Sequence, residues 1–401
     1  MKKQLLFLTS IFCVMLLQAQ MRMPQSNLPR FNRWLNNDEF VINTKLKAGA
    51  PSADYVYNII TKAYTPAPAA VLKEEATVSL KSGEVVIKVS GVETVLTSDK
   101  GDKKNPQLSP DGQFVGYTKD NNLYTVGVAD KKVTAITSEK ERGILNGYAS
   151  WVYFEEIFGR ATQYRAFWWS PDSKYISFMR FDEEKVPMFP IYNSEGLHGF
   201  VEETRYPKVG DPNPTVKIGW STPTGGKITW ADFNDQEDQY FGWPIWNPNN
   251  KSMWLPWMDR GQNNLKIYEL DMTSGAKKEV YQEYQKTWID LEDRVNGRIN
   301  FIANNEGYIA QSDASGWNQL YLYDMNGQLI NPITNGKYTV TGIKLIDENH
   351  INKKYVLEVP IDDNLIFSKI FSNFDSLCGR FVSCVWPYPT FTYVIMVALN
   401  F

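Results

Sequence analysis

The chain has 401 residues, of which 43% are hydrophobic and 22% charged. This composition is typical of a folded globular protein and excludes a largely disordered one. The 42 basic and 45 acidic residues leave a net charge of -3, which is too small to favour nucleic acid as a partner. Aromatic residues make up 14%, which favours β structure. There are only two His, His198 and His350, so a hydrolase that needs a His base has few candidates.

Residues 1–20 predict a signal peptide. Lys2 and Lys3 precede an apolar run over residues 5–17, and Gln18-Ala19-Gln20 offers a cleavage site. The run is short for a membrane span, and a buried N-terminal helix is the alternative. We therefore expect an exported protein, periplasmic or secreted. No Cys occurs between residues 21 and 377, which excludes a Cys-based metal site or a catalytic thiol from that body.

Short strands separated by turn residues fill the body of the chain. Apolar and aromatic patterns predict strands at 114–117, 123–126, 175–179, 265–270 and 320–323. Polar clusters such as 119–122 and 324–327 end them. No long amphipathic helix is predicted, so the expected fold class is all-β.

A repeated motif precedes several of these strands. Leu108-Ser109-Pro110-Asp111-Gly112, Trp169-Ser170-Pro171-Asp172-Ser173 and Trp246-Asn247-Pro248-Asn249-Asn250 share one form: an apolar residue, a polar residue, Pro and a turn pair. A hairpin of this kind cannot bury its face alone, so copies must pack against one another. The prolines are 61 and 77 residues apart, against about 40–45 residues for a compact propeller blade. The spacing predicts a β-propeller whose blades carry inserted loops.

The C-terminal residues 354–401 differ in composition. Residues 381–401 carry no charge and include Pro387 and Pro389. A membrane helix is one interpretation, but the two prolines argue against a straight helix. The other is an atypical tail unrelated to the fold, such as an out-of-frame end.

Two adjacent carboxylates stand in an apolar run, Asn146-Gly147-Tyr148-Ala149-Ser150-Trp151-Val152-Tyr153-Phe154-Glu155-Glu156-Ile157-Phe158. Like charges side by side in such surroundings require a cation. Arg160 or Arg165 could supply it as a purely structural partner, or a ligand ammonium could supply it. The residues alone favour the structural arginine.

The segment resembles the Trp-Val-Tyr-Glu-Glu-Glu-Phe-like motif of the dipeptidyl peptidase IV family, and its bacterial members in particular. Phe154 replaces the first Glu of that motif, and Ser150 replaces an Asp. The segments 167–175, 206–217 and 259–265 also look like the family, in the same order. The resemblance covers about residues 30–350, and the tail lies outside it.

The resemblance implies a propeller domain over residues 21–353, with about five to six blades of the family's eight. It implies that Glu155 and Glu156 hold the free α-amino group of a peptide substrate. Tyr323 is the expected equivalent of an aromatic residue that lines the family's substrate cavity; an ordinary core aromatic is the alternative for this residue. The implied activity is a serine-type release of N-terminal dipeptides, typically after Pro or Ala, in an enzyme that can form a homodimer.

The sequence departs from the family in its catalytic parts. It contains no Gly-x-Ser-x-Gly, and His198 lies in a loop-like segment, so no catalytic residue is assigned and the chain alone is predicted to be inactive. No Arg occurs between Arg33 and Arg142, so the family's carbonyl-binding Arg is absent or replaced. No metal site, cofactor, membrane partner or nucleic acid partner is expected. A truncated recognition propeller is the first hypothesis, and a stand-alone peptide-binding propeller or a non-functional fragment are the alternatives.

Overall fold

The computed structural model describes residues 30–35, 39–47, 50–68, 76–249, 251–289, 298–302, 306–340, 342–347, 354–360 and 392–398. The chain divides into two compact units, residues 1–73 and 74–401. The predicted signal peptide lies outside the described residues, as does His350.

The first unit contains one antiparallel sheet of four strands in sequential order. These are β1 (Arg30–Trp34), β2 (Glu39–Thr44), β3 (Ala53–Asn58) and β4 (Ala63–Pro66). On this sheet the ring of Tyr57 lies 5.3 Å from Phe40 and 4.6 Å from Tyr64, so cross-strand aromatic pairs stabilise it.

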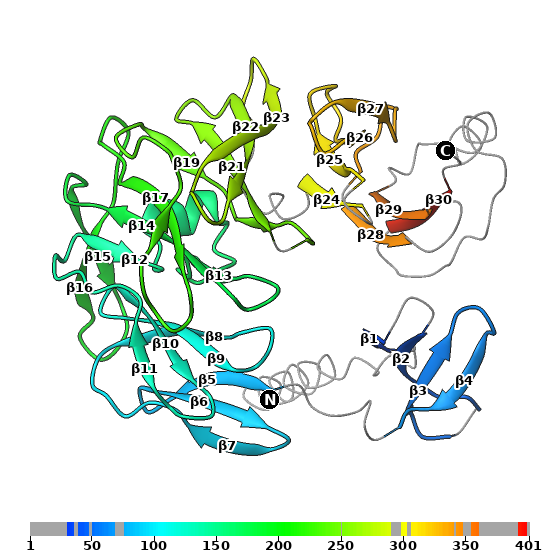
Figure 1. Cartoon of the computed structure of the whole chain (residues 1–401), viewed down its shortest axis with the longest axis horizontal. Coiled ribbons are helices and arrows are strands. Elements are labelled where there is room, and N and C mark those ends of the chain that lie inside the picture. Colours follow the sequence, from blue (N-terminus) through cyan, green and yellow to red (C-terminus); the bar gives the residue numbers. More distant parts are fainter. Residues whose placement is uncertain are drawn as a thin grey trace, which may run out of the picture. The chain divides into compact units, whose positions relative to one another are not determined.

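Within the described residues of the second unit, six successive antiparallel sheets are arranged as the blades of a β-propeller (Figure 1), in addition to one two-stranded hairpin. The first two are β5 (Thr77–Lys81), β6 (Glu84–Val89) and β7 (Val92–Val95), then β8 (Lys103–Leu108), β9 (Phe114–Lys119), β10 (Asn122–Gly127) and β11 (Val133–Ala135). The third joins β12 (Ile144–Asn146), β13 (Phe167–Trp169), β14 (Ile176–Asp182), β17 (Thr215–Ser221) and β18 (Thr229–Trp230).

The remaining three sheets follow in chain order. The fourth joins β19 (Gln239–Phe241), β20 (Ile245–Trp246), β21 (Ser252–Asp259), β22 (Asn264–Asp271) and β23 (Lys277–Tyr284). The fifth contains β24 (Ile299–Phe301), β25 (Tyr308–Ser312), β26 (Gln319–Tyr323) and β27 (Leu329–Pro332), and the sixth β28 (Gly342–Asp347), β29 (Lys354–Pro360) and β30 (Thr392–Ala398). The all-β propeller prediction is confirmed, and each of the five predicted strands lies within or overlaps an observed one.

Within the uncharged tail, Thr392–Ala398 is a strand that pairs antiparallel with β29, rather than part of a membrane helix. Among the residues that the structure describes, no helix is long and apolar enough to cross a membrane.

The repeated motif forms the same tight turn in successive blades. Ser109 Oγ donates to Asp111 Oδ1 (2.6 Å) and accepts from the Phe114 N–H (2.9 Å). Ser170 makes the equivalent pair of bonds with Asp172 and Tyr175 in the next blade. The polar residue before Pro therefore closes the hairpin from β8 to β9 and from β13 to β14.

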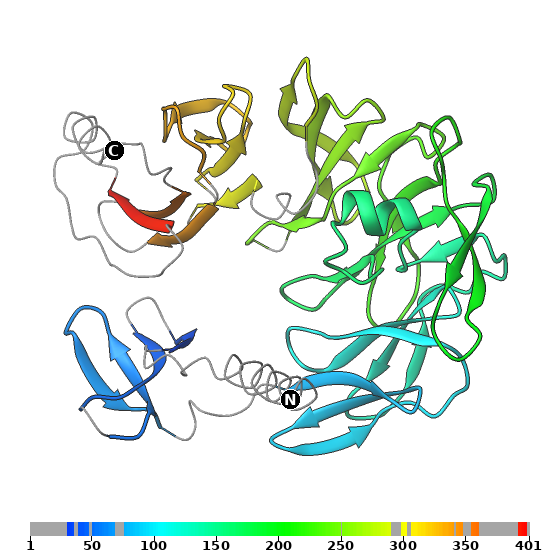
Figure 2. The same ribbon diagram turned by 180° about the vertical axis from the view of Figure 1, so that it is seen from behind.

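These turns also tie neighbouring blades together. The Asp111 N–H donates to Ser173 Oγ (3.0 Å), and the Trp169 indole donates to the Gln107 carbonyl (3.2 Å). Between the fourth and fifth blades the Tyr308 hydroxyl donates to the Val280 carbonyl (2.7 Å). The third, fourth and fifth blades follow one another in the ribbon of Figure 2. One large apolar core extends across these three blades, which explains why copies of the motif must pack on one another.

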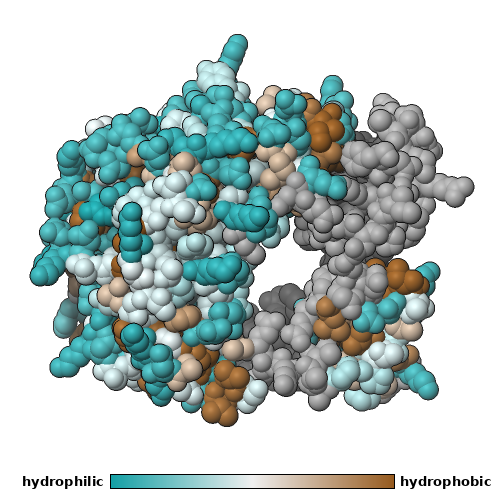
Figure 3. Space-filling view, in the orientation of Figure 1, coloured by the Kyte–Doolittle hydropathy of each residue, from teal (hydrophilic) through white to brown (hydrophobic). Residues whose placement is uncertain are grey.

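One insertion leaves the third blade as a two-stranded hairpin, β15 (Met188–Asn193) and β16 (Phe200–Arg205). Its connecting loop carries His198, which is exposed, as the sequence predicts. In the face seen in Figure 3 the described surface is mainly hydrophilic, and its apolar residues form separate small patches.

Candidate functional site

The two adjacent glutamates stand on a short helical turn between β12 and β13. Residues Tyr153–Ile157 form the π-helix η1, in which the Phe158 N–H donates to the Tyr153 carbonyl (2.8 Å). The Arg160 N–H closes the wider turn by donating to the Phe154 carbonyl (2.8 Å). Single π-turns are rare and are frequently found at functional sites.

The apolar residues of this turn anchor it in the propeller core. Tyr153, Ile157 and Phe158 are each only 1% exposed. The Tyr153 hydroxyl accepts a hydrogen bond from the Phe241 N–H (3.1 Å), which joins η1 to β19 of the next blade. Since these residues point inward, Glu155 and Glu156 are directed to the opposite side of the turn.

The structure separates the roles of the two carboxylates. Glu155 is half-buried and forms an ion pair with Arg160, whose own side chain is 66% exposed. Glu156 is exposed, and within the described parts of the chain no ion pair or hydrogen bond joins its carboxylate to another residue. One of the two structural cations expected from the sequence is therefore present, but it serves only Glu155.

Arg165 is not the partner of either glutamate. Its guanidinium donates to the Phe167 carbonyl (2.8 Å), and burial lowers its pKa. Glu156 instead lies near β19: burial raises the pKa of the Tyr240 phenol, and the carboxylates of Asp238 and Glu156 act in the same direction. Glu156 thus lies close enough to Tyr240 of the fourth blade to act on it, and no ion-pair partner of Glu156 occurs within the described residues.

Tyr323 lies on a different blade from the glutamates. On β26 its ring stacks on Tyr308 (5.3 Å between centroids) and meets Tyr281 edge-on (5.4 Å). It is half-buried against the core, and burial raises its pKa. No contact within the described residues brings Tyr323 to the glutamate turn, and its role in lining a substrate cavity stays a prediction.

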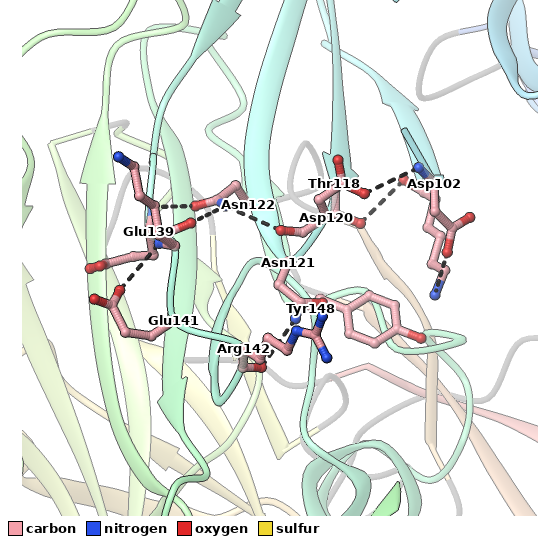
Figure 4. A pocket seen from close by; sticks show the side chains of 11 residues that line it. Asp102, Thr118, Asp120, Asn121, Asn122, Glu139, Glu141, Arg142 and Tyr148 are labelled. Carbon is pink, nitrogen blue, oxygen red and sulfur yellow. Dashed lines mark hydrogen bonds and ion pairs between the residues drawn. The ribbon is translucent and has the colours of Figure 1, made fainter. Parts of the chain in front are cut away.

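A polar pocket of about 480 Å³ lies at one end of the second blade (Figure 4). Its lining includes Lys104, Arg142 and Tyr148. Asn122 shapes it: its amide donates to the Glu139 carbonyl and its Oδ1 accepts from the Glu139 N–H, both at 2.8 Å. No sequence pattern predicts this pocket, since its lining comes from separated segments that only the blade topology brings together.

The pocket adjoins the segment before the glutamate turn through Tyr148, and Asn105, next to the lining residue Lys104, bonds to the segment after the turn. The Lys104 ammonium lies 4.8 Å from the centre of the Tyr148 ring, and Tyr148 precedes η1. The Asn105 amide donates to the Gln163 carbonyl (2.9 Å), on the segment that returns from the turn. In the described residues no group of three or more His, Cys, Asp or Glu could hold a metal ion.

The chain matches the family model for the dipeptidyl peptidase IV (DPP IV) N-terminal region over residues 72–353. A probable dipeptidyl peptidase 4 of Aspergillus clavatus is 29% identical over 336 residues, which are 76% of this chain and 43% of that protein. The dipeptidyl peptidase 4 of Trichophyton rubrum is 33% identical over 270 residues, 63% of this chain and 33% of that protein.

Solved structures agree on the fold. A crystal structure of Porphyromonas gingivalis dipeptidyl peptidase 4 has a TM-score of 0.64 at 20% identity, and covers 84% of this chain and 50% of that one. A putative dipeptidyl aminopeptidase IV from Bacteroides ovatus has a TM-score of 0.60 at 21% identity, over 83% of this chain and 51% of that one. The chain thus spans less than half the length of the curated relatives described above.

Proposed function

Because the chain belongs to the dipeptidyl peptidase IV N-terminal region family, we propose that its propeller recognises the free N-terminus of peptides through Glu155 and Glu156. It would act as the recognition part of an exported serine-type dipeptidyl aminopeptidase, with release of dipeptides after Pro or Ala. The Ser, His and Asp chemistry of such an enzyme is assigned to a domain outside the propeller. No catalytic residue is assigned to this chain.

The observation that carries the proposal is that Glu156 has no ion-pair partner within the described residues, while its neighbour Glu155 pairs only with the exposed Arg160. Glu155 is half-buried, but Arg160 is 66% exposed, so solvent screens the pair; ion pairs at the surface contribute about 0–1 kcal/mol. A peptide ammonium can therefore share Glu155 with Arg160, or replace Arg160, without a large loss of interaction free energy. Two carboxylates can accept all three N–H donors of an ammonium, and each such charge-assisted bond is about twice as strong as a neutral one.

The test compares a peptide that has a free amine with its acetylated twin by calorimetry. We expect the purified protein to prefer the free amine. Glu156→Gln should reduce that preference at least about tenfold, which corresponds to about 1.4 kcal/mol. Glu195→Gln, which removes an exposed charge in the β15–β16 loop, is the matched control and should change nothing. Equal affinity for both peptides would rule the proposal out.

Arg160→Gln distinguishes a ligand site from a self-contained ion pair. If Arg160 only occupies Glu155 until a peptide arrives, its removal should leave the free-amine affinity unchanged or strengthen it. A loss of affinity in this variant would instead mean that the pair itself holds the site in shape, and would count against the proposed exchange.

Lys104 is our candidate for the cation that the family's Arg supplies to the substrate carbonyl. It lies over Tyr148, beside the glutamate turn. Burial acts to lower the pKa of Lys104, but Tyr148 and Asp102 outweigh it and the pKa is raised, so the side chain stays charged. Lys104→Ala should weaken peptide binding, while Lys104→Arg should preserve it. Unchanged binding in Lys104→Ala would exclude this role.

We also propose that the protein forms a homodimer, as the family resemblance implies, and that the β15–β16 hairpin contributes to its interface. Met188, Tyr192, Phe200 and Val201 on this hairpin are 50–68% exposed. Light scattering coupled to size exclusion should give a dimer mass that the double variant Tyr192→Ser/Val201→Ser shifts toward the monomer. A monomer in the unmodified protein would refute this part.

Export is proposed from residues 1–20, on their sequence pattern alone. N-terminal sequencing of the protein from the extracytoplasmic fraction should begin at or near residue 21. Recovery of the intact N-terminus from the cytoplasm would refute export.

A further inference from the structure

A continuous row of aromatic rings runs from the pocket, through the glutamate turn, to the β15–β16 hairpin. The ring of Tyr148 stacks on Tyr164 (5.1 Å, 4°), and Tyr164 stacks on Phe154 (3.8 Å, 14°). Phe154 meets Trp151 edge-on (6.2 Å), and Trp151 packs on Tyr206 (5.5 Å). We call these five rings, Tyr148, Tyr164, Phe154, Trp151 and Tyr206, the aromatic row.

The aromatic row extends beyond Tyr206 into the hairpin and ends there on a cation. Tyr206 packs on Phe189 of β15 (5.5 Å), and the Lys208 ammonium lies 4.2 Å above the Phe189 ring. The Tyr206 N–H donates to the Pro187 carbonyl (3.1 Å), which fixes Tyr206 at the base of the hairpin. Lys104 covers Tyr148 at the other end of the row in the same way.

Phe154 is the central ring, and it immediately precedes Glu155. Its carbonyl accepts the Arg160 N–H that closes the turn, and its ring is held between Tyr164 and Trp151. Loss of this ring would therefore loosen the turn whose backbone carries Glu155 and Glu156. Tyr164 has a positive φ of 69°, and its carbonyl accepts from the Ala149 N–H (2.7 Å), so the surrounding loop is fixed as well.

The five rings of the row are all half-buried. A row of this kind at the rim of the core responds to what binds beside it more readily than a fully packed interior does. It joins two features that lie about 50 residues apart in sequence: the glutamates and the base of the hairpin.

We propose that Tyr206 is a positioning residue for the ammonium site, which acts on Glu155 and Glu156 through Trp151 and Phe154. The hairpin thereby sets how well the propeller selects peptides with a free N-terminus. This inference rests on the proposed function, because it assumes that the glutamates bind an ammonium.

The test measures the ratio of affinities for a free-amine peptide and its acetylated twin in variants of the row. We expect Tyr206→Ala and Phe154→Ala each to lower this ratio about tenfold. Tyr206→Phe should keep it, because it retains the ring. Tyr124→Ala is the matched control: Tyr124 is also half-buried, stacks on Tyr117 (5.7 Å) and has a lysine above it, but it lies on β10 outside the row.

The outcomes separate this inference from the proposed function. If the unmodified protein does not distinguish the two peptides, the proposed function fails. If it distinguishes them but Tyr206→Ala keeps the same ratio, only the positioning role fails. A loss of the same size in Tyr124→Ala or in Tyr206→Phe would also overturn it, since the effect would then not depend on this row of rings.

Discussion

The hydroxyl of Tyr153 is the hydrogen-bonding group that links the glutamate turn to the next blade. It accepts from the Phe241 N–H at 3.1 Å and lies 3.4 Å from the Gln239 carbonyl. Tyr153 is 1% exposed and Phe241 is fully buried, so water cannot replace the lost partner. Tyr153→Phe therefore keeps the ring contacts and removes only the hydrogen bonds.

The expected loss of stability follows from the group left behind. A buried N–H without a partner costs about 1–3 kcal/mol. Part of this cost is offset, because the phenyl ring has no hydroxyl that must give up its hydration on folding. We expect the free energy of unfolding to fall by about 1–2 kcal/mol. Tyr175→Phe is the matched control, because no hydrogen bond within the described residues involves the Tyr175 hydroxyl.

Urea unfolding followed by tryptophan fluorescence measures the difference. The midpoint should move to lower urea with an unchanged slope, since the surface exposed on unfolding stays the same. The free-amine preference of the peptide assay should fall in parallel. A Tyr153→Phe midpoint equal to that of the parent would refute the anchoring role of this hydroxyl.

Three further predictions concern the blades and the hairpin base. Ser109→Ala removes both side-chain hydrogen bonds of the first repeated turn and should lower stability by about 1–2 kcal/mol in urea unfolding, whereas Ser315→Ala in an exposed turn should not. Gly147→Ala should also destabilise, because Gly147 has a φ of 71° and its new Cβ would lie 3.2 Å from Leu123; an unchanged melting temperature would contradict this. Burial raises the pKa of Glu183 to about 7, so folding disfavours its charge and stability is lost as pH rises from about 4.5 to 7. Glu183→Gln should then be more stable than the parent at pH 8, by up to about 3 kcal/mol, and equal to it at pH 4; a gain of the same size at both values would disprove this assignment.

Much of the fold could be predicted because its signals are local. The strand at 114–117 and the turn at Ser109-Pro110-Asp111 depend on residues a few positions apart, and the structure contains both. The repetition of that turn predicted blades, since hairpins with one apolar face must pack on copies of themselves.

The candidate site was predictable only in part. The sequence shows that Glu155 and Glu156 are adjacent. It does not show which arginine pairs with them, because Arg160 and Arg165 are both close along the chain. The π-turn decides between them: it directs Arg160 to Glu155 and leaves Arg165 bonded to the Phe167 carbonyl.

The sequence by itself determined the strands, the repeated turns and the presence of an acidic pair in an apolar segment, because each depends on neighbours along the chain. Only the tertiary structure decided that Tyr323 packs with Tyr308, that Arg160 pairs with Glu155, and that Trp151 meets Tyr206. Tyr308 faces Tyr323 through the register of β25 and β26, and Trp151 meets Tyr206 across about 55 residues of chain. The partner of Glu155 depends on the shape of one turn, so no local sequence pattern predicts any of the three.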